Sequence, residues 1–305
     1  MRFAVEAWAP EYGIAADEER LEESGESVDV DVEVPASSWA PMRTPGPGAD
    51  RVTFVDGVRR IDARIWIIDG TGAHAGVCAS VAAGAVVANG GGACVSEWLV
   101  ERAIFAAGST PGERVETRHA TYEFRPAPGD DPDAVYLAIH EHMTALEARV
   151  AQQPGCELVV FDGPLRGRRD PCAVGYVKTQ RVQYLPAELM AVIASLGDGE
   201  RTPLFLIGGR SFTRWSCYLR LPGPVTHPLA GVVRLEFPGQ GRSADAAARA
   251  DLVAATLPRF ASEAHKDPRA PQNLYPIAGL ERRLRHLLGD QLVLDRALRR
   301  AAAGR

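Results

Sequence analysis

The feature that most constrains the fold is a short apolar run in the middle of the chain, Glu157-Leu-Val-Val-Phe-Asp162, which Gly163-Pro164 ends. Apolar residues without alternation predict a strand that is buried on both faces of a sheet. A sheet covered on both faces needs helices, and a helical pattern runs over Ala134 to Gln152, just before this strand. We therefore predict an α/β fold with a mixed sheet flanked by helices.

The chain before this helix has the pattern of strands. Apolar segments at Val52–Asp56, Ala63–Ile68 and Val77–Val87 are separated by glycines, and they predict an antiparallel meander with its first turn at Gly57. A further strand is predicted within residues 114–125. Beyond the central strand we predict strands at 174–178, 204–207, 215–221 and 232–237, and helices at 186–196, 245–257, 278–288 and 292–302.

The first fifty residues differ in composition from the rest. They contain an acidic segment, Asp17–Glu23, an alternating segment, Val28–Val34, and a connector rich in proline and glycine at residues 40–49. We expect an acidic N-terminal arm and linker over residues 1–50. One domain, which closes with C-terminal helices, is then expected over residues 51–305.

Composition restricts the class of protein. A content of 46% hydrophobic and 24% charged residues is typical of a globular protein with a substantial core. A net charge of -5 argues against a wholly basic nucleic-acid coat, although clustered arginines can make one groove basic. No long apolar run follows Arg2, and none elsewhere is suited to a membrane span. We expect a cytoplasmic protein without a membrane partner.

Two aspartates carry the strongest chemical signal. Asp56 and Asp162 each close an apolar strand and precede a glycine, which places a carboxylate at the rim of a sheet. If the two strands are neighbours, the carboxylates would converge, and a divalent cation would relieve their repulsion. The alternative is that both are ordinary turn aspartates, because Asp-Gly is a common turn dipeptide.

The order of four segments resembles the NurA family of DNA-end-processing nucleases. These segments are Phe54-Val-Asp56-Gly57, Leu158-Val-Val-Phe-Asp162-Gly163-Pro-Leu165, Val174-Gly-Tyr-Val-Lys178 and the Tyr275-Pro element. The resemblance spans about Val52 to Leu288 and implies an RNase H-like fold. One departure concerns a histidine that typical members have after the Tyr-Pro element, where this chain has Glu281-Arg282-Arg283.

The resemblance implies a set of site residues. Asp56, Glu147 and Asp162 are the implied metal ligands for Mn²⁺ or Mg²⁺, with two ions expected. Glu141 competes with Glu147 on the same predicted helix, and the helical period turns the two side chains to different faces. The remaining candidate site residues are Lys178 for a phosphate, Tyr275 for a water or phosphate, and His265 for metal or DNA. His286, on an arginine-rich helix, is the alternative histidine.

The resemblance also implies an activity and partners. It implies a 5'-3' exonuclease with single-strand endonuclease activity, which resects DNA ends in double-strand break repair. The implied partners are single-stranded and duplex DNA ends, a HerA-like hexameric ATPase and a second copy of the chain. The alternative is a catalytically silent RNase H-like module that binds nucleic acid or a partner protein, and the missing histidine favours it.

Overall fold

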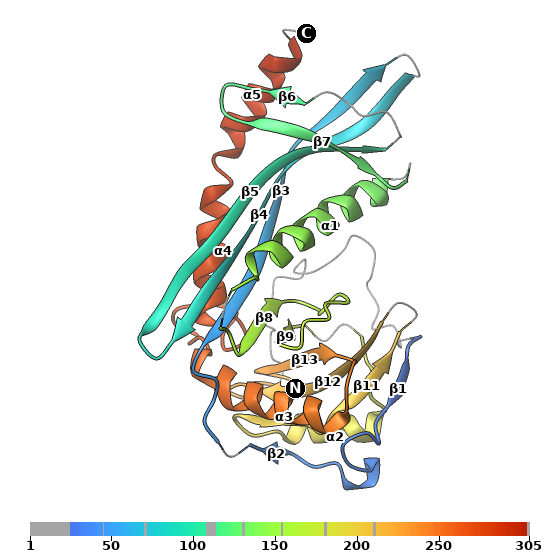
Figure 1. Cartoon of the computed structure of the whole chain (residues 1–305), viewed down its shortest axis with the longest axis vertical. Coiled ribbons are helices and arrows are strands. Elements are labelled where there is room, and N and C mark those ends of the chain that lie inside the picture. The colour runs from blue at the N-terminus through green and yellow to red at the C-terminus, as the bar shows by residue number, and fades with distance from the viewer. Residues whose placement is uncertain are drawn as a thin grey trace, which may run out of the picture. The chain divides into compact units, whose positions relative to one another are not determined.

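The structure is a computed structural model that describes residues 25–44, 46–69, 72–107, 114–129, 132–153, 155–179, 182–209 and 212–303 (Figure 1). The acidic segment Asp17–Glu23 lies outside the described residues. The chain divides into two compact units. Unit 1 comprises residues 1–54, 88–93 and 155–278, and unit 2 comprises residues 55–87, 94–154 and 279–305. The expected division into an arm (1–50) and one domain (51–305) stays a prediction.

Unit 1 contains a mixed sheet with the strand order β1-β11-β12-β13-β9-β8. Strand β8 pairs in parallel with β9, and the other neighbours in this order pair antiparallel. The two short strands β2 and β10 pair with each other, and β10 also pairs with β12. The strands are β1 Ser27–Asp29, β2 Met42–Arg43, β8 Leu158–Asp162, β9 Ala173–Val177, β10 Glu200–Arg201, β11 Phe205–Gly208, β12 Thr213–Arg220 and β13 Val232–Pro238.

Helices of unit 1 bury apolar residues against this sheet. Helix α2 (Ala187–Ser195) inserts Leu189 and Ile193 into a cluster with aromatic residues of β11 and β12, where the rings of Phe205 and Tyr218 stack at 5.8 Å. Burial of such side chains contributes roughly 1.5–3 kcal/mol each. The other helical segments are η1 Ala36–Ser38, α3 Ser243–Thr256 and η2 Leu257–Phe260.

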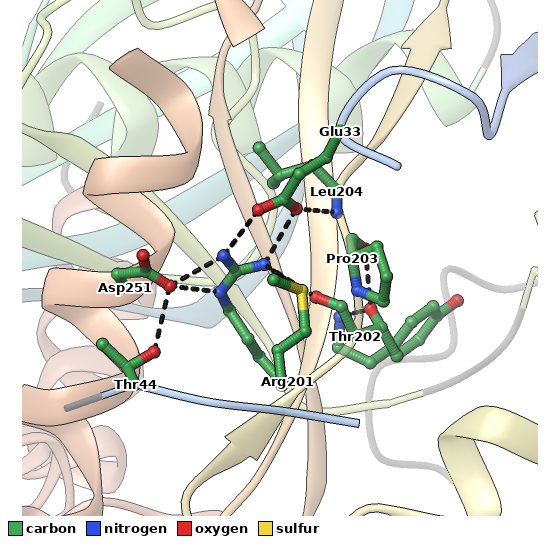
Figure 2. Close-up of polar contacts among 9 residues, drawn as sticks. Glu33, Thr44, Arg201, Thr202, Pro203, Leu204 and Asp251 are labelled. Carbon is green, nitrogen blue, oxygen red and sulfur yellow. Dashed lines mark hydrogen bonds and ion pairs between the residues drawn. The ribbon is translucent and has the colours of Figure 1, made fainter. Parts of the chain in front are cut away.

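One buried arginine joins the N-terminal strands of unit 1 to its sheet. Arg201 donates hydrogen bonds to both carboxylate oxygens of Glu33, at 2.7 and 2.9 Å, and to Asp251 at 2.7 Å (Figure 2). Burial alone would lower the pKa of Arg201, but the bonds to Glu33 and Asp251 raise it above its usual value. Arg201 therefore stays charged and holds two segments that are distant in sequence.

Unit 2 has a second set of strands in the order β3-β4-β5-β7-β6. Strand β5 pairs in parallel with β7, and β7 pairs antiparallel with β6. Three of these strands are unusually long compared with the mean of roughly 5–6 residues in globular proteins. The bounds are β3 Val52–Asp69, β4 Gly72–Asn89, β5 Gly92–Ala107, β6 Val115–Glu116 and β7 Thr121–Ala127.

Helices cover both faces of the strands in unit 2. Helix α1 (Pro132–Val150) packs over Gly57 of β3, while α4 (Tyr275–Leu287) packs over Gly84 of β4 through Leu280 and Leu284. Helix α5 (Gln291–Ala303) contributes Leu298 to a cluster with Cys78. Cys78 and Gly84 lie an even number of residues apart on one strand, so α4 and α5 cover the same face. The predicted α/β class, a mixed sheet flanked by helices, is confirmed.

The predicted turn at Gly57 is wrong. Strand β3 continues through this residue to Asp69, so the two strands predicted at 52–56 and 63–68 are one element, and Asp56 lies inside it. A Cβ at Gly57 would come 2.6 Å from Glu147 Oε1 and 2.7 Å from Met143 Cγ. Gly57 is thus explained by the close approach of α1, because a glycine inside a strand leaves room for another element to pack against it.

Most other predicted elements occur with shifts of a few residues. The predicted alternating strand at Val28–Val34 is shorter, because β1 ends at Asp29, whose carboxylate accepts the backbone N–H of Asp31. The central strand ends at Asp162 as predicted. No helix in the described part of the chain is both long and apolar enough to cross a membrane.

Candidate functional site

In unit 2, two of the implied ligands are buried beside the same glycine. Asp56 is 7% exposed and Glu147 is 6% exposed. The backbone N–H of Gly57 donates to Asp56 Oδ1 at 2.8 Å, and Glu147 Oε1 lies directly over Gly57. Buried carboxylates are rare because the charged form loses hydration, so each of the two is a candidate ligand for a cation. Strand β3 and helix α1 position the pair.

Burial separates the two candidate glutamates of α1. Glu147 faces the strands of unit 2, whereas Glu141 is exposed. The helical period accounts for this difference, since residues so spaced cannot share one face. Of these two residues, Glu147 is therefore the candidate for a buried metal ligand.

A third buried carboxylate of unit 2 has a structural explanation. Asp62, also on β3, accepts hydrogen bonds from Arg60 Nε at 2.9 Å, Ser80 Oγ at 2.5 Å and Tyr122 Oη at 2.9 Å. Burial and the charge of Asp62 together raise the pKa of the Cys78 thiol to about 12. This carboxylate is saturated by protein donors, which distinguishes a structural role from a ligand role.

In unit 1, Asp162 and Lys178 form an ion pair. Lys178 Nζ lies 2.7 Å from Asp162 Oδ2, with the lysine side chain 3% exposed and the aspartate side chain 16% exposed. The parallel register of β8 and β9 explains the contact, because Asp162 is opposite Tyr176, and Lys178 directly follows the end of β9. A buried ammonium group needs such a partner.

Asn273 is a neighbour of this pair that the sequence did not reveal. Its Oδ1 accepts from Lys178 Nζ at 2.9 Å, and its Nδ2 donates to Asp267 Oδ2 at 2.7 Å. The adjacent Gln272 accepts the Tyr176 hydroxyl through its backbone oxygen at 2.7 Å. The only sequence signal is that Asn273 directly precedes the Leu-Tyr-Pro element, since contact across such a separation leaves no periodic pattern.

The loop after Asp162 rests on a buried glutamate. Glu236 Oε2 accepts the backbone N–H of Leu165 at 2.7 Å, and Glu236 Oε1 accepts from Arg214 and Arg234 at 3.0 and 2.5 Å. Burial alone would raise the pKa of Glu236, but Arg234, the Leu165 N–H and Arg214 hold it below its usual value. Gly163, with a φ of 111°, supplies the left-handed turn that Asp162-Gly163 predicted.

The two remaining implied residues lie at the surface of unit 1. Tyr275 is 37% exposed, and its hydroxyl accepts from Lys266 Nζ at 3.4 Å. The His265 side chain is 69% exposed, and its Nδ1 lies 3.3 Å from Glu263 Oε2. The roles that the resemblance implies for Tyr275 and His265 stay predictions.

The carboxylates of the candidate site come from different units. Asp56 and Glu147 belong to unit 2, and Asp162 with Lys178 belongs to unit 1. Within the residues that the structure describes, no group of three or more histidine, cysteine, aspartate or glutamate side chains is arranged to hold a metal ion. The implied three-carboxylate set therefore stays a prediction.

Comparisons with known proteins identify the class. A family model described as the NurA domain matches residues 50–284, which makes this protein a nuclease. The match spans most of the chain and agrees with the family resemblance drawn from its motifs. The chain belongs to the NurA family. No curated protein sequence matches it significantly.

Solved structures of nucleases show weaker similarity. The NurA nuclease from Sulfolobus solfataricus has 13% identity and a TM-score of 0.48, with 81% of each chain covered. Endonuclease V from Bacillus subtilis has 11% identity and a TM-score of 0.36, and the catalytic domain of human endonuclease V has 15% and 0.38. Both comparisons cover 81% of this chain and 85% of the other. The family assignment rests on the family model.

Proposed function

We propose that this nuclease hydrolyses phosphodiester bonds at DNA ends with divalent cations held by Asp56, Glu147 and Asp162. The observation that carries the proposal is the burial of two acidic side chains, Asp56 on β3 and Glu147 on the helix that packs over the next residue, Gly57. Carboxylate oxygens are hard donors suited to Mn²⁺ or Mg²⁺. Asp162 joins this set because it stands in the Phe-Asp-Gly element that resembles the family's.

The pair in unit 2 fits a cation by its chemistry. Both side chains are acidic, more than nine-tenths buried and held on regular elements. When bound, one or two divalent cations supply a Lewis acid for the scissile phosphate and lower the pKa of water. Asp56 and Glu147 would hold such ions, and the surrounding apolar residues of α1 and β3 would keep their carboxylates in place.

In unit 1, we propose that the charge of Lys178 positions a phosphate of the substrate. Its ammonium group is shared between Asp162 and Asn273, so the carboxylate and the amide fix the direction of the lysine side chain. A point charge of this kind suits a phosphate oxygen. Tyr275 and His265, which are both exposed, are proposed to contact DNA.

The finer biological role follows the family. We propose 5'-3' exonuclease action with single-strand endonuclease activity, in double-strand break repair in the cytoplasm. A HerA-like hexameric ATPase would deliver duplex DNA to a homodimer of this chain. The catalytic function is favoured over a silent module because Asp56 and Glu147, the acidic residues that the family resemblance implies as ligands, are both present and buried on regular elements.

The test compares Glu147→Gln with Glu141→Gln on the same helix. Glu147 is buried and Glu141 is exposed, so the two substitutions remove the same charge in different surroundings. We expect Glu147→Gln, Asp56→Asn and Asp162→Asn each to lower Mn²⁺-dependent cleavage of end-labelled DNA by about 100-fold or more. Glu141→Gln should cleave like wild type.

Metal binding gives a second readout. Titration calorimetry with Mn²⁺ should show weaker binding for the Glu147→Gln and Asp56→Asn variants and unchanged binding for Glu141→Gln. Equal cleavage by wild type and all three ligand variants would overturn the site assignment. DNA binding by wild type without cleavage under Mn²⁺ or Mg²⁺, with and without an ATPase partner, would identify the silent module instead.

A further inference from the structure

A basic groove lies in unit 2, lined by residues that the proposed reaction does not use. It has a volume of about 580 Å³ and runs between the turn joining β6 to β7 and helix α5. Arg118 and His119 line it from the turn, and Arg296 and Arg300 line it from the helix. All four side chains are exposed, so solvent ions and ligands can reach them.

The charge in this groove is one-sided. Among the described residues that line it, Glu116 is the only acidic one, and Glu116 Oε1 is paired with Arg114 at 2.6 Å. Arg296 donates its Nε to the backbone oxygen of Leu292 at 3.2 Å, which orients its guanidinium group without neutralising it. A groove with excess positive charge on a protein of net charge -5 is a local site for an anion.

Both walls of the groove are held in place. Thr117 Oγ1 donates to the Ala120 backbone oxygen at 2.8 Å and accepts the backbone N–H groups of His119 and Ala120. These bonds lock the tight turn that presents Arg118 and His119. On the other wall, Leu298 of α5 packs against Val115 and Tyr122. A fixed arrangement lowers the entropy that a ligand would lose on binding.

We infer that this groove binds the phosphodiester backbone of DNA outside the site of cleavage. Guanidinium groups donate two parallel hydrogen bonds to phosphate oxygens, and Arg296 and Arg300 lie one helical turn apart on the same face. The floor between them consists of small and apolar side chains, Val293, Ala297 and Ala301, which permit close approach of a strand. The identity of the anion as DNA rests on the proposed function.

Helix α5 itself offers the control. Arg299 is exposed on the same helix, but it does not line the groove, and its Nε is paired with Asp295 at 2.8 Å. The double variant Arg296→Gln/Arg300→Gln is compared with Arg299→Gln. Binding of the full chain to labelled single-stranded and duplex DNA is measured by fluorescence anisotropy in EDTA, so that no cleavage occurs.

We expect the double variant to bind DNA about 10-fold or more weakly at low salt. Its slope of log affinity against log salt should fall by about 0.7 to 0.9 for each lost phosphate contact, and Arg299→Gln should change neither quantity appreciably. Cleavage of a minimal phosphodiester, bis(p-nitrophenyl) phosphate, should be unchanged in the double variant. Failure of the proposed function would appear as no cleavage by wild type, whereas failure of the groove appears in binding alone.

Three outcomes would overturn the inference. One is absence of DNA binding by wild type, and another is an affinity and salt slope of the double variant equal to those of Arg299→Gln. The third uses polyglutamate as a competitor: displacement of DNA from wild type at equal charge concentration, with no such effect on the double variant, would assign the groove to an acidic protein partner.

Discussion

Replacement of Gly57 by alanine tests the packing that brings α1 onto β3. The new Cβ would lie 2.6 Å from Glu147 Oε1 and 2.7 Å from Met143 Cγ. An ordinary contact needs at least 3.4 Å, so the Glu147 carboxylate must move by about 0.8 Å. Misplacement of a reacting group by about 1 Å costs roughly 100-fold in rate, and we expect a loss of this order in Mn²⁺-dependent DNA cleavage.

The same substitution should lower stability. Overpacking of a well-packed core costs about 1–3 kcal/mol, partly offset by roughly 0.5–1 kcal/mol because alanine has less freedom in the unfolded chain than glycine. The net expectation is a loss of up to about 2.5 kcal/mol in the free energy of unfolding, measured by urea denaturation. Gly279→Ala in α4 is the control, because its Cβ would meet no atom within 4 Å.

A second substitution separates the two effects. Met143→Ala in the Gly57→Ala background removes Met143 Cγ and Sδ, so the double variant should be more stable than the sum of the single changes implies. Cleavage should stay low, since Glu147 remains displaced. Wild-type cleavage and unfolding in Gly57→Ala would refute the reasoning, and so would recovery of cleavage on removal of Met143.

Two further predictions concern unit 1. Glu236 has a pKa below its usual value of 4.5, so its contribution to stability is present at neutral pH and is lost as the pH falls below about 4.5. In Glu236→Gln, the free energy of unfolding in urea should therefore change less between neutral and acidic pH than in wild type. A pH dependence equal to that of wild type would contradict this. Arg201→Met should lower stability by about 3–5 kcal/mol, because it leaves Glu33 without its buried partner. Arg43→Met is the control, because it removes an ion pair with Glu200 in which the arginine side chain is 74% exposed, and it should lower stability by at most about 1 kcal/mol. Limited proteolysis should cut near residue 44 in Arg201→Met but not in Arg43→Met.

Local sequence patterns were sufficient to predict an element when the pattern is set by the residues of that element alone. The apolar run that ends in Asp162 predicted a buried strand, and the periodic residues before it predicted α1, because period and continuity are set by the element itself. The Asp162-Gly163 turn also follows from local chemistry, since only glycine adopts its φ of 111° without strain.

The failure at Gly57 shows what a pattern cannot contain. An Asp-Gly pair in an apolar stretch has the same local signal whether it turns the chain or admits a helix from the other side. The distinction depends on Met143 and Glu147, which lie far along the chain and contribute nothing to the local propensity at Gly57.

The sequence by itself determined the class of fold, the central strand, the helix before it and the family to which the chain belongs. Only the tertiary structure decided that Asp56 lies within a continuous strand, that Glu147 rather than Glu141 is buried, and that Asn273 contacts Lys178. The physical reason is range: strand and helix patterns come from neighbours in sequence, whereas burial and charge pairing depend on residues that folding brings together.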